Sequence, residues 1–378
     1  MILVAPTSFK GTLGAAEAAR AMARGVGRAA PGARVVELPL SDGGPGLIDA
    51  LQVAACGEVV RVEVTGPLGE RVEGRLLHVG GGVVLESADA CGYHLVPPER
   101  RDPLRTTTYG VGELILAAAR SLRERGPASG RGSGAGALEG RIVVGLGGSA
   151  TVDGGAGMAE ALGWRLLGAG GEPIARGGGG LLGLERIGRP ASPLALPPVV
   201  GLTDVRNPLL GAEGAAVVFG PQKGAGPREV ELLEEGLSRL AARIEEDLGL
   251  DVRGLPGAGA AGGLGAGLVA FAGGELVPGS AWVFDAVGFD EALREARLLV
   301  TGEGCYDAQT GMGKVVGEAV ERARARGIPV LIVAGRIAAG LPAGVSGVDG
   351  SGAILTADGV EELAWRGAAQ LLTGAASE

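Results

Sequence analysis

The sequence predicts an α/β protein built on a doubly wound parallel sheet. Short apolar runs recur along the chain, and each ends in a polar or glycine-rich loop. Helical patterns lie between several of these runs, as expected for crossovers that join parallel strands. Hydrophobic residues make up 46% of the chain and aromatic residues only 3%, so we expect a core of Val, Leu, Ile and Ala side chains.

The predicted strands are continuous runs of Val, Ile and Leu, which are typical of strands buried on both faces of a parallel sheet. In chain order they are MILVAP at 1–6, RVVELPL at 34–40, GRIVVGLGG at 140–148, PPVVGLTDV at 197–205, LLVTGEG at 298–304 and IPVLIVAG at 328–335. Helices are predicted at 13–30 and 313–327. Because ligands of such sheets bind beyond the carboxyl ends of the strands, the loops there are the expected functional positions.

The stretch 59–88 differs, because apolar and polar residues alternate in it around a GPLGE turn, as they do in hairpin strands. We interpret it as the entry into a second domain. The predicted architecture is a Rossmann-like α/β domain formed by 1–60 together with 285–378, and a mixed α/β domain inserted at 61–284. The Gly/Ser/Ala-rich segment 125–140 is predicted to be a flexible loop.

Composition excludes several classes of protein. The net charge of −9 argues against a nucleic-acid partner, which would require a basic face. No run of 18 apolar residues and no basic-then-apolar leader is present, so we expect neither a membrane span nor a signal peptide. The three cysteines are scattered without metal or disulfide spacing, which favours a cytoplasmic location.

Lysine is rare, since only three of the 34 basic residues are lysines: Lys10, Lys223 and Lys314. Each of them is next to a glycine. Lysine is a compact point charge that fits beside a phosphate in a tight loop, whereas arginine is a planar fork. We therefore expect at least two of the three to face an anionic ligand, although drift of the composition towards arginine is the simpler explanation of their small number.

The most specific motif is GLGGSATVDGGAGMAEALG at 145–163, which follows a predicted strand and opens a predicted helix. The amides of Gly147, Gly148 and Ser149 could bind phosphate oxygens at the amino end of that helix. Thr151 could add a hydroxyl and Asp153 a carboxylate. The alternative is a glycine-rich turn without a ligand.

Two stretches match dinucleotide fingerprints, GLGGSA at 145–150 and GAGAAG at 257–262. Neither is followed by the acidic residue that such a site needs, and the second does not follow a strand, so we do not assign a dinucleotide site. A Walker loop is absent, because Ala308 and Val315 replace its first glycine and its Ser/Thr.

Three acidic loops follow predicted strands. They contain Asp42 in LSDGG, Asp204 and Asn207 in LTDVRNP, and Glu303 and Asp307 in TGEGCYDAQT. Carboxylates and lysines at one sheet edge suit Mg-nucleotide chemistry, and a spare carboxylate could accept a proton from a substrate hydroxyl. Each Asp taken alone is better explained as a turn former or helix cap, and only the set at one sheet edge favours function.

Two further segments offer groups for a substrate. Arg206 and Lys223 are candidates for binding an anionic group, with a solvated surface charge as the alternative for each. RTTTYGVGELI at 105–115 places hydroxyls, including that of Thr107, before a predicted helix. An ordinary helix start explains any one of these threonines as well.

Taken together, these loops resemble the type I glycerate kinase family, in the same order along residues 1 to about 336. The matching motifs are APTSFKGTL, PLSDGGPG, TTTYGVGELI, VGLGGSATVDGGAGMAEALG, TDVRNPLLGAEGAAVVFGPQKGA, PGAGAAGGLGAGL and VTGEGCYDAQTGMGK. The resemblance implies ATP- and Mg²⁺-dependent phosphorylation of D-glycerate by a two-domain α/β protein with its active site in the cleft between the domains. The usual bacterial product would be 2-phosphoglycerate.

On this interpretation Lys10 and the amides of Gly147–Ser149 hold phosphates. Asp42 or Asp204 acts as base or metal ligand, and Lys223 or an arginine receives the glycerate carboxylate. The remaining assignments are Thr151, Glu303 and Lys314 to the nucleotide, Ser8, Thr107, Arg206 and Asn207 to glycerate, and Asp153 and Asp307 to the metal. Phosphorylation of another small hydroxy acid and a non-catalytic nucleotide- or metabolite-binding role are the alternatives, and a homodimer is the expected assembly.

The sequence departs from the family pattern at four positions. Thr7 and Pro45 stand where the family usually has an acid, Val152 where it has an amide and Cys305 where it has Arg or Ser. Polar groups near the expected site are therefore missing, and we expect the departures to bear on substrate preference.

Overall fold

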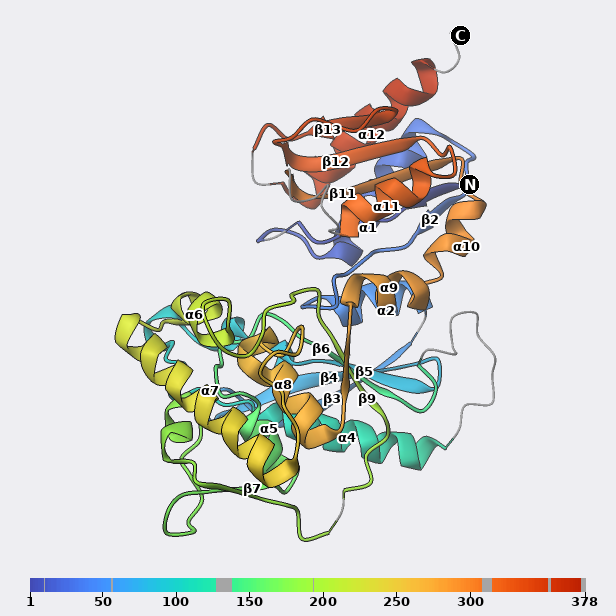
Figure 1. The fold of residues 1–378 in the computed structure, drawn as a ribbon. Helices are drawn as coiled ribbons and strands as arrows, with labels where there is room; N and C mark the ends of the chain where they lie inside the picture. The colour runs from blue at the N-terminus through green and yellow to red at the C-terminus, as the bar shows by residue number, and fades with distance from the viewer. Residues whose placement is uncertain are drawn as a thin grey trace. The chain divides into compact units, whose positions relative to one another are not determined.

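The computed structural model describes residues 1–9, 11–55, 57–126, 138–192, 194–307, 315–352 and 355–374. The chain divides into two units. Unit 1 consists of Met1–Asp42, Gly46–Gly57 and Ser280–Glu378, and unit 2 of Gly43–Pro45 and Glu58–Gly279. The blue amino-terminal and red carboxyl-terminal segments in Figure 1 therefore belong to the same unit, while unit 2 comes from the middle of the sequence.

Unit 1 contains a five-stranded sheet in the order β13-β12-β11-β1-β2, and every neighbouring pair is parallel. Its strands are β1 Ile2–Val4, β2 Val35–Glu37, β11 Leu298–Tyr306, β12 Val330–Ile337 and β13 Val345–Asp349. The strand order reverses between β1 and β11, because β2 lies on one side of β1 and the later strands lie on the other. This reversal is the topological switch point of a doubly wound sheet.

Helices cover both faces of this sheet (Figure 1). They are α1 Ala15–Ala29, α2 Leu47–Ala55, α9 Gly279–Ala286, α10 Phe289–Arg294, α11 Val315–Arg324 and α12 Ala357–Gly374. Ile2 and Val4 pack in the cluster that includes α1 and α12, whereas Leu3 packs in the cluster that includes α10 and α11. Alternate residues of β1 are thus buried on opposite faces, as its unbroken apolar run requires.

Unit 2 contains a six-stranded mixed sheet in the order β10-β9-β6-β5-β4-β3. Strands β5, β6, β9 and β10 are parallel, while β3, β4 and β5 form an antiparallel meander. The strands are β3 Glu58–Thr65, β4 Arg71–Val79, β5 Gly82–Glu86, β6 Ile142–Gly145, β9 Val199–Leu202 and β10 Glu275–Val277. A separate antiparallel pair is formed by β7 Arg165–Leu167 and β8 Arg186–Gly188.

The helices of unit 2 share one large apolar core with this sheet. They are α3 Ala88–Cys91, α4 Tyr109–Arg125, α5 Ala156–Ala161, α6 Ala215–Phe219, α7 Pro227–Leu248 and α8 Ala260–Ala272. Short 3₁₀ helices are η1 Tyr93–Leu95, η2 Pro98–Arg100, η4 Gly178–Gly183 and η5 Pro221–Lys223. The predicted α/β class, with a doubly wound parallel sheet and a mixed second sheet, is confirmed.

The local predictions agree with these elements except at three places. The alternating stretch 59–88 forms three strands of a meander, not one hairpin. The helix expected at 313–327 is described from Val315 to Arg324. Most of the loop predicted at 125–140 lies outside the described residues.

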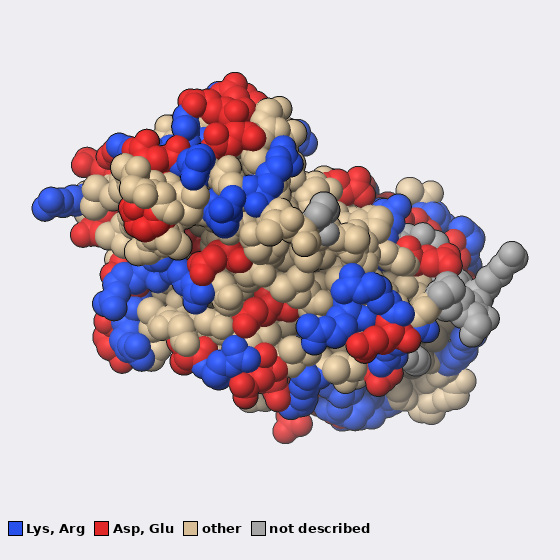
Figure 2. Space-filling view, turned by 90° about the horizontal axis from the view of Figure 1, so that it is seen from below, with Lys and Arg blue, Asp and Glu red and all other residues tan. Residues whose placement is uncertain are grey.

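Acidic and basic side chains are intermingled on the face shown in Figure 2, where the described residues form no continuous basic area. Among the described residues many surface charges form local ion pairs, as Arg61 does with Glu73 and Arg176 with Glu160. This distribution agrees with the net charge of −9.

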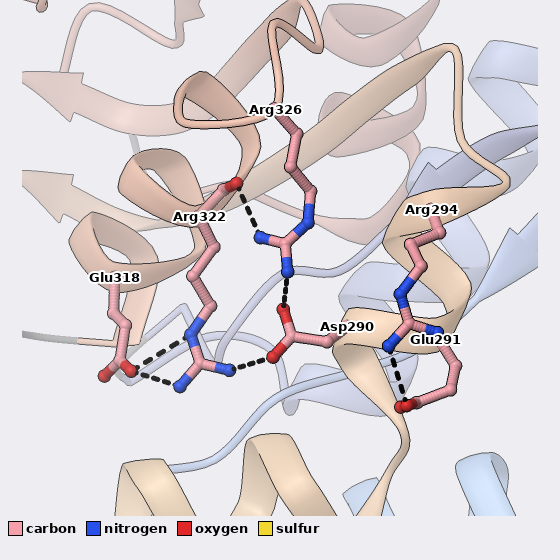
Figure 3. A network of polar contacts seen from close by, with 6 residues as sticks. All are labelled: Asp290, Glu291, Arg294, Glu318, Arg322 and Arg326. Atoms are coloured by element: carbon pink, nitrogen blue, oxygen red, sulfur yellow. Dashed lines mark hydrogen bonds and ion pairs between the residues drawn. The ribbon is translucent and has the colours of Figure 1, made fainter.

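An ion-pair network connects α10 with α11 (Figure 3). Arg322 donates to Asp290 at 2.8 Å and to Glu318 at 2.5 Å, and its guanidinium lies 4.4 Å from the centre of the Phe284 ring. Arg326 pairs with the other carboxylate oxygen of Asp290 at 3.0 Å. Asp290 therefore joins Arg322 of α11 and Arg326, just beyond the end of that helix, to the first turn of α10.

We expect Asp290→Ala to lower the free energy of unfolding by about 1 kcal/mol, because the half-buried Arg322 and the more exposed Arg326 lose their shared carboxylate. Glu291→Ala is the matched control, since Glu291 occupies the next position of the same turn but forms an exposed pair with Arg294. Its cost should stay below about 0.5 kcal/mol. Urea unfolding of both variants measures the difference, and equal costs would contradict the role given to Asp290.

Candidate functional site

The parallel strands of unit 2 end side by side at one edge of the sheet. Glu86 of β5 is in register with Gly145 of β6, and Gly145 with Leu202 of β9. The segments that follow these three strands therefore start next to one another. This is the edge at which open α/β sheets bind ligands.

The loop after β6, residues 146–155, is the central segment of this edge, and we call it the β6–α5 loop. Among the described residues, no hydrogen bond is formed by the N–H groups of Gly147, Gly148 and Ser149. Gly148 has a left-handed backbone (φ +60°), and a Cβ at that position would lie 2.7 Å from Pro45. Three successive amides are thus available as donors in a backbone conformation that favours glycine.

The relation of these amides to a helix differs from the prediction. Helix α5 begins only at Ala156 and ends at Ala161, so Gly147–Ser149 do not lie in its first turn. The side chain of Asp153 occupies that position, where it accepts hydrogen bonds from the amides of Gly155 and Gly157, each at 3.2 Å. The expected position of these amides at a helix amino end is therefore wrong, because they belong to the loop that precedes the helix.

Asp153 is fully buried and is surrounded by donors of the protein itself. Besides the amides of Gly155 and Gly157, its carboxylate accepts from the backbone N–H and the hydroxyl of Thr108, both at 2.9 Å. Burial raises the pKa of this carboxyl, and the four hydrogen bonds oppose that rise. Asp153, which the sequence predicts as a metal ligand, thus connects Thr108, at the start of α4, to the start of α5. Thr108 itself was not among the predicted site residues.

Lys223 is buried beneath the β6–α5 loop, with 2% of its surface exposed. It is the last residue of η5, and its ammonium donates to Ser149 Oγ at 2.8 Å and to the carbonyl of Thr151 at 2.7 Å. Burial lowers its pKa to about 8, and the nearby Asp153 carboxylate opposes that shift. The alternative of a solvated surface charge is therefore wrong for Lys223.

Cys91 lies at the same buried position, on the segment after β5. The carbonyl of Cys91 accepts from the amide of Ala150 at 2.7 Å, which attaches α3 to the β6–α5 loop. Burial raises the pKa of its thiol to about 12, so the thiol is protonated and neutral at physiological pH. Sequence reasoning did not select Cys91, because no motif marks it.

The GAGAAG stretch at 257–262 packs against the backbone of the β6–α5 loop. Ala261, Gly262 and Gly263 all have left-handed backbones at the start of α8, with φ of +52°, +73° and +87°. The carbonyl of Gly262 accepts from the amide of Gly154 at 3.1 Å, and a Cβ on Gly262 would lie 1.9 Å from the carbonyl oxygen of Thr151. The glycines there permit backbone-to-backbone packing, so their role differs from that of a dinucleotide fingerprint.

The loop after β9 carries three predicted residues. Asp204 and Arg206 are exposed, whereas Asn207 is half-buried and donates its side-chain N–H to the carbonyl of Glu213 at 2.8 Å. The carbonyl of Asn207 accepts from the amide of Gly259, so this residue also attaches its loop to the start of α8. Asp42, which is exposed, directly precedes the Gly43–Pro45 segment that packs in unit 2.

Unit 1 has its own candidate edge at the switch point between β1 and β11. The amide of Thr7 donates to the carbonyl of Gly302 at 2.9 Å, so the segment after β1 continues alongside β11. Ser8, Glu303 and Asp307 are partly buried at this edge. Lys10 and Lys314, the two lysines predicted here, lie outside the described residues.

Other predicted groups are engaged within unit 2. Thr107 is buried, and its hydroxyl accepts from the amide of Tyr109 at 3.2 Å, which fits the alternative of a helix start. Thr151 is fully buried, and its hydroxyl has no oxygen or nitrogen partner among the described residues. Of the four departures from the family pattern, Val152 is a core residue, Cys305 is exposed, and Thr7 and Pro45 have the contacts given above.

Neither a metal cluster nor a membrane helix is recognisable in the described part of the chain. No three His, Cys, Asp or Glu side chains of these residues lie together as a metal-binding group. No described helix combines the length and the apolar character that crossing a bilayer requires.

The model of the glycerate kinase family matches residues 2–378. The chain belongs to the glycerate kinase family. A glycerate kinase of Halalkalibacterium halodurans is 44% identical over 346 residues, which cover 90% of this chain and 87% of the relative. A glycerate 2-kinase of Escherichia coli K12 is 41% identical over 374 residues, covering 97% of this chain and 93% of that protein.

A solved structure supports the same membership of this family. A crystal structure from Salmonella typhimurium LT2, provisionally named glycerate kinase 2, has a TM-score of 0.82 and 41% sequence identity. The similarity covers 99% of each chain. Members of this family are kinases, so use of ATP follows from membership.

We expect Gly262→Ala to destabilise the protein by more than about 2 kcal/mol, because its Cβ would overlap the Thr151 carbonyl in addition to the strain of a left-handed alanine. Gly273→Ala is the matched control, since Gly273 has φ +62° at the end of α8 with open space around it. Only the conformational strain of about 1 kcal/mol should remain there. Equal losses in thermal unfolding would contradict close packing at Gly262.

The neighbouring residue should respond in the opposite direction. Ala261 has φ +52°, which is costly for a residue with a Cβ. We expect Ala261→Gly to stabilise the folded protein, by up to about 1 kcal/mol after the greater entropy of glycine in the unfolded chain is subtracted. A lower melting temperature for this variant would show that the backbone at 261 is not strained.

Proposed function

We propose that this protein transfers the γ-phosphoryl group of ATP to D-glycerate and forms 2-phosphoglycerate in the cytoplasm. The observation that carries the proposal is the row of three available amides at Gly147–Ser149 in a chain of the glycerate kinase family. Available amides in a loop of fixed conformation are suited to phosphate oxygens. The name of the Escherichia coli relative favours the 2-phosphorylated product.

In-line phosphoryl transfer requires mainly positioning and neutralisation of charge. In this proposal the Gly147–Ser149 amides and Lys10 bind phosphates, with Glu303, Lys314 and Thr151 as further residues of the nucleotide site. Asp42 or Asp204 accepts the proton of the glycerate hydroxyl. Arg206 binds the glycerate carboxylate, because it is the exposed cation on the loop that also carries Asp204.

Magnesium is part of the proposal, and the carboxylates available to it are unequal. Asp153 accepts four hydrogen bonds within the protein and is fully buried, so its oxygens are poorly suited to an added ion. The other candidates are Asp307 and whichever of Asp42 and Asp204 is not the base, since Mg²⁺ in nucleotide sites uses one or two carboxylates together with phosphate oxygens. The ion would neutralise charge on the transferred group.

The direct test is phosphorus NMR of the product after incubation with D-glycerate, ATP and Mg²⁺. Formation of 2-phosphoglycerate is the expected result, and 3-phosphoglycerate would overturn the regiochemistry. A panel of small hydroxy acids distinguishes another substrate, which would be indicated by ADP release with a different acid and none with D-glycerate. No ADP release with any acid, together with measurable ATP binding, would indicate a nucleotide-binding protein.

We expect Lys10→Ala to lower kcat by two orders of magnitude or more, because losing a cation that neutralises the transferred group costs about 3 kcal/mol of the barrier. The kcat and the KM for ATP are measured separately: a fall in kcat indicates contact in the transition state, and a rise in KM alone indicates ground-state binding. Turnover within threefold of the parent would show that Lys10 is structural.

A further inference from the structure

Lys223 connects two parts of unit 2 that are distant in sequence. Its two acceptors, Ser149 Oγ and the carbonyl of Thr151, are 74 and 72 residues earlier in the chain and lie on either side of Ala150 in the β6–α5 loop. One ammonium therefore fixes both the hydroxyl and the backbone of this loop. The row of available amides at 147–149 ends at the same serine.

The stability of the folded protein does not explain why residue 223 carries a positive charge. Its ammonium forms no ion pair with any described residue, and a buried charge without a paired counter-charge is costly. The titratable groups around it are the neutral Cys91 thiol on α3 and the Asp153 carboxylate, which is bound by other donors, while Arg101 on the neighbouring segment lies over the Tyr93 ring. An apolar side chain of similar length would avoid this cost.

The hydrogen bond from the Lys223 ammonium to Ser149 Oγ indicates a function for the positive charge. Because the hydroxyl oxygen accepts from a cation, the hydroxyl proton remains to be donated to another group, and a hydroxyl polarised in this way is a stronger donor. The next donors along the loop are the amides of Gly147, Gly148 and Ser149. A phosphate bound by these amides would be close to that hydroxyl.

We propose that Lys223 is a positioning residue for ATP: it holds the Ser149 hydroxyl and the adjacent amides as donors for the phosphates, and it does not contact D-glycerate. The inference rests on the proposed function and replaces the expected role of Lys223 as the receiver of the substrate carboxylate. The burial of its side chain supports this, because a carboxylate would have to displace one of two protein acceptors.

The test is Lys223→Met, which keeps the length of the side chain and removes the ammonium. Calorimetric titration with MgATP, without D-glycerate, should show a dissociation constant raised at least tenfold. In steady state, kcat should fall and the KM for D-glycerate should stay within threefold. An unchanged affinity for MgATP, or a tenfold rise in the KM for D-glycerate alone, would overturn the proposal.

A double-mutant cycle with Ser149→Ala tests whether Lys223 acts through the serine. Ser149→Ala removes the hydroxyl and leaves the bond of the ammonium to Thr151. If Lys223 acts through that hydroxyl, the double variant should bind MgATP about as weakly as Lys223→Met alone. Losses that multiply would show independent effects and would contradict the proposed route. If Lys223→Met does not fold, Ser149→Ala alone decides the question. A weaker affinity of the folded Ser149→Ala variant for MgATP supports the proposal, and an unchanged affinity refutes it.

Thr106→Val is the matched control for loss of a buried hydrogen bond to the same loop. The Thr106 hydroxyl donates to the carbonyl of Ala150 at 2.8 Å and has no bond to Ser149. Its removal should lower the melting temperature but keep the affinity for MgATP within threefold of the parent. If Thr106→Val weakens MgATP binding as much as Lys223→Met does, general loosening of the loop explains both results.

The same measurements separate this inference from the proposed function. A parent protein that binds MgATP but does not phosphorylate D-glycerate refutes the proposed substrate, and the affinities of the variants still decide the role of Lys223. A parent that does not bind MgATP overturns both.

Discussion

A single buried carboxylate organises the glycine-rich edge of unit 2. Asp153 accepts hydrogen bonds from Thr108 at the start of α4 and from the first turn of α5, so one side chain determines where two helices begin. Because this carboxylate is bound by four donors, its burial leaves no oxygen without a partner. Asp153 itself lies near the end of the β6–α5 loop and fixes the loop where it meets α5.

Three further contacts fix the same loop. The Lys223 ammonium donates two hydrogen bonds to the loop, and the left-handed Ala261–Gly263 segment packs against the loop backbone. Pro45 lies next to Gly148. These contacts come from segments far apart in the sequence. A loop restrained from several sides presents its amides with little reorganisation when a ligand binds, and such preorganised donors are the main source of rate in phosphoryl transfer.

The sequence predicted what depends on local patterns. Unbroken Val/Ile/Leu runs were sufficient to predict β1, β6, β9, β11 and β12, because a strand that is buried on both faces has apolar residues at successive positions. The surroundings of Lys223 could not be predicted, since they are supplied by residues more than 70 positions away. Gly147–Ser149 were expected at the amino end of the helix, but Asp153 accepts the hydrogen bonds of the amides at that end. Pro45 could be recognised as unusual but not as a contact of Gly148.

The pairing of β1 with β11 also bears on how the chain acquires its structure. Ile2 is in register with Leu298, so the central pair of strands in unit 1 joins the two ends of the sequence. During synthesis β1 leaves the ribosome nearly 300 residues before its partner, whereas the strands of unit 2 are all present by Val277. Unit 2 can therefore complete its sheet first, whereas β1 can pair only with β2 until β11 has been made.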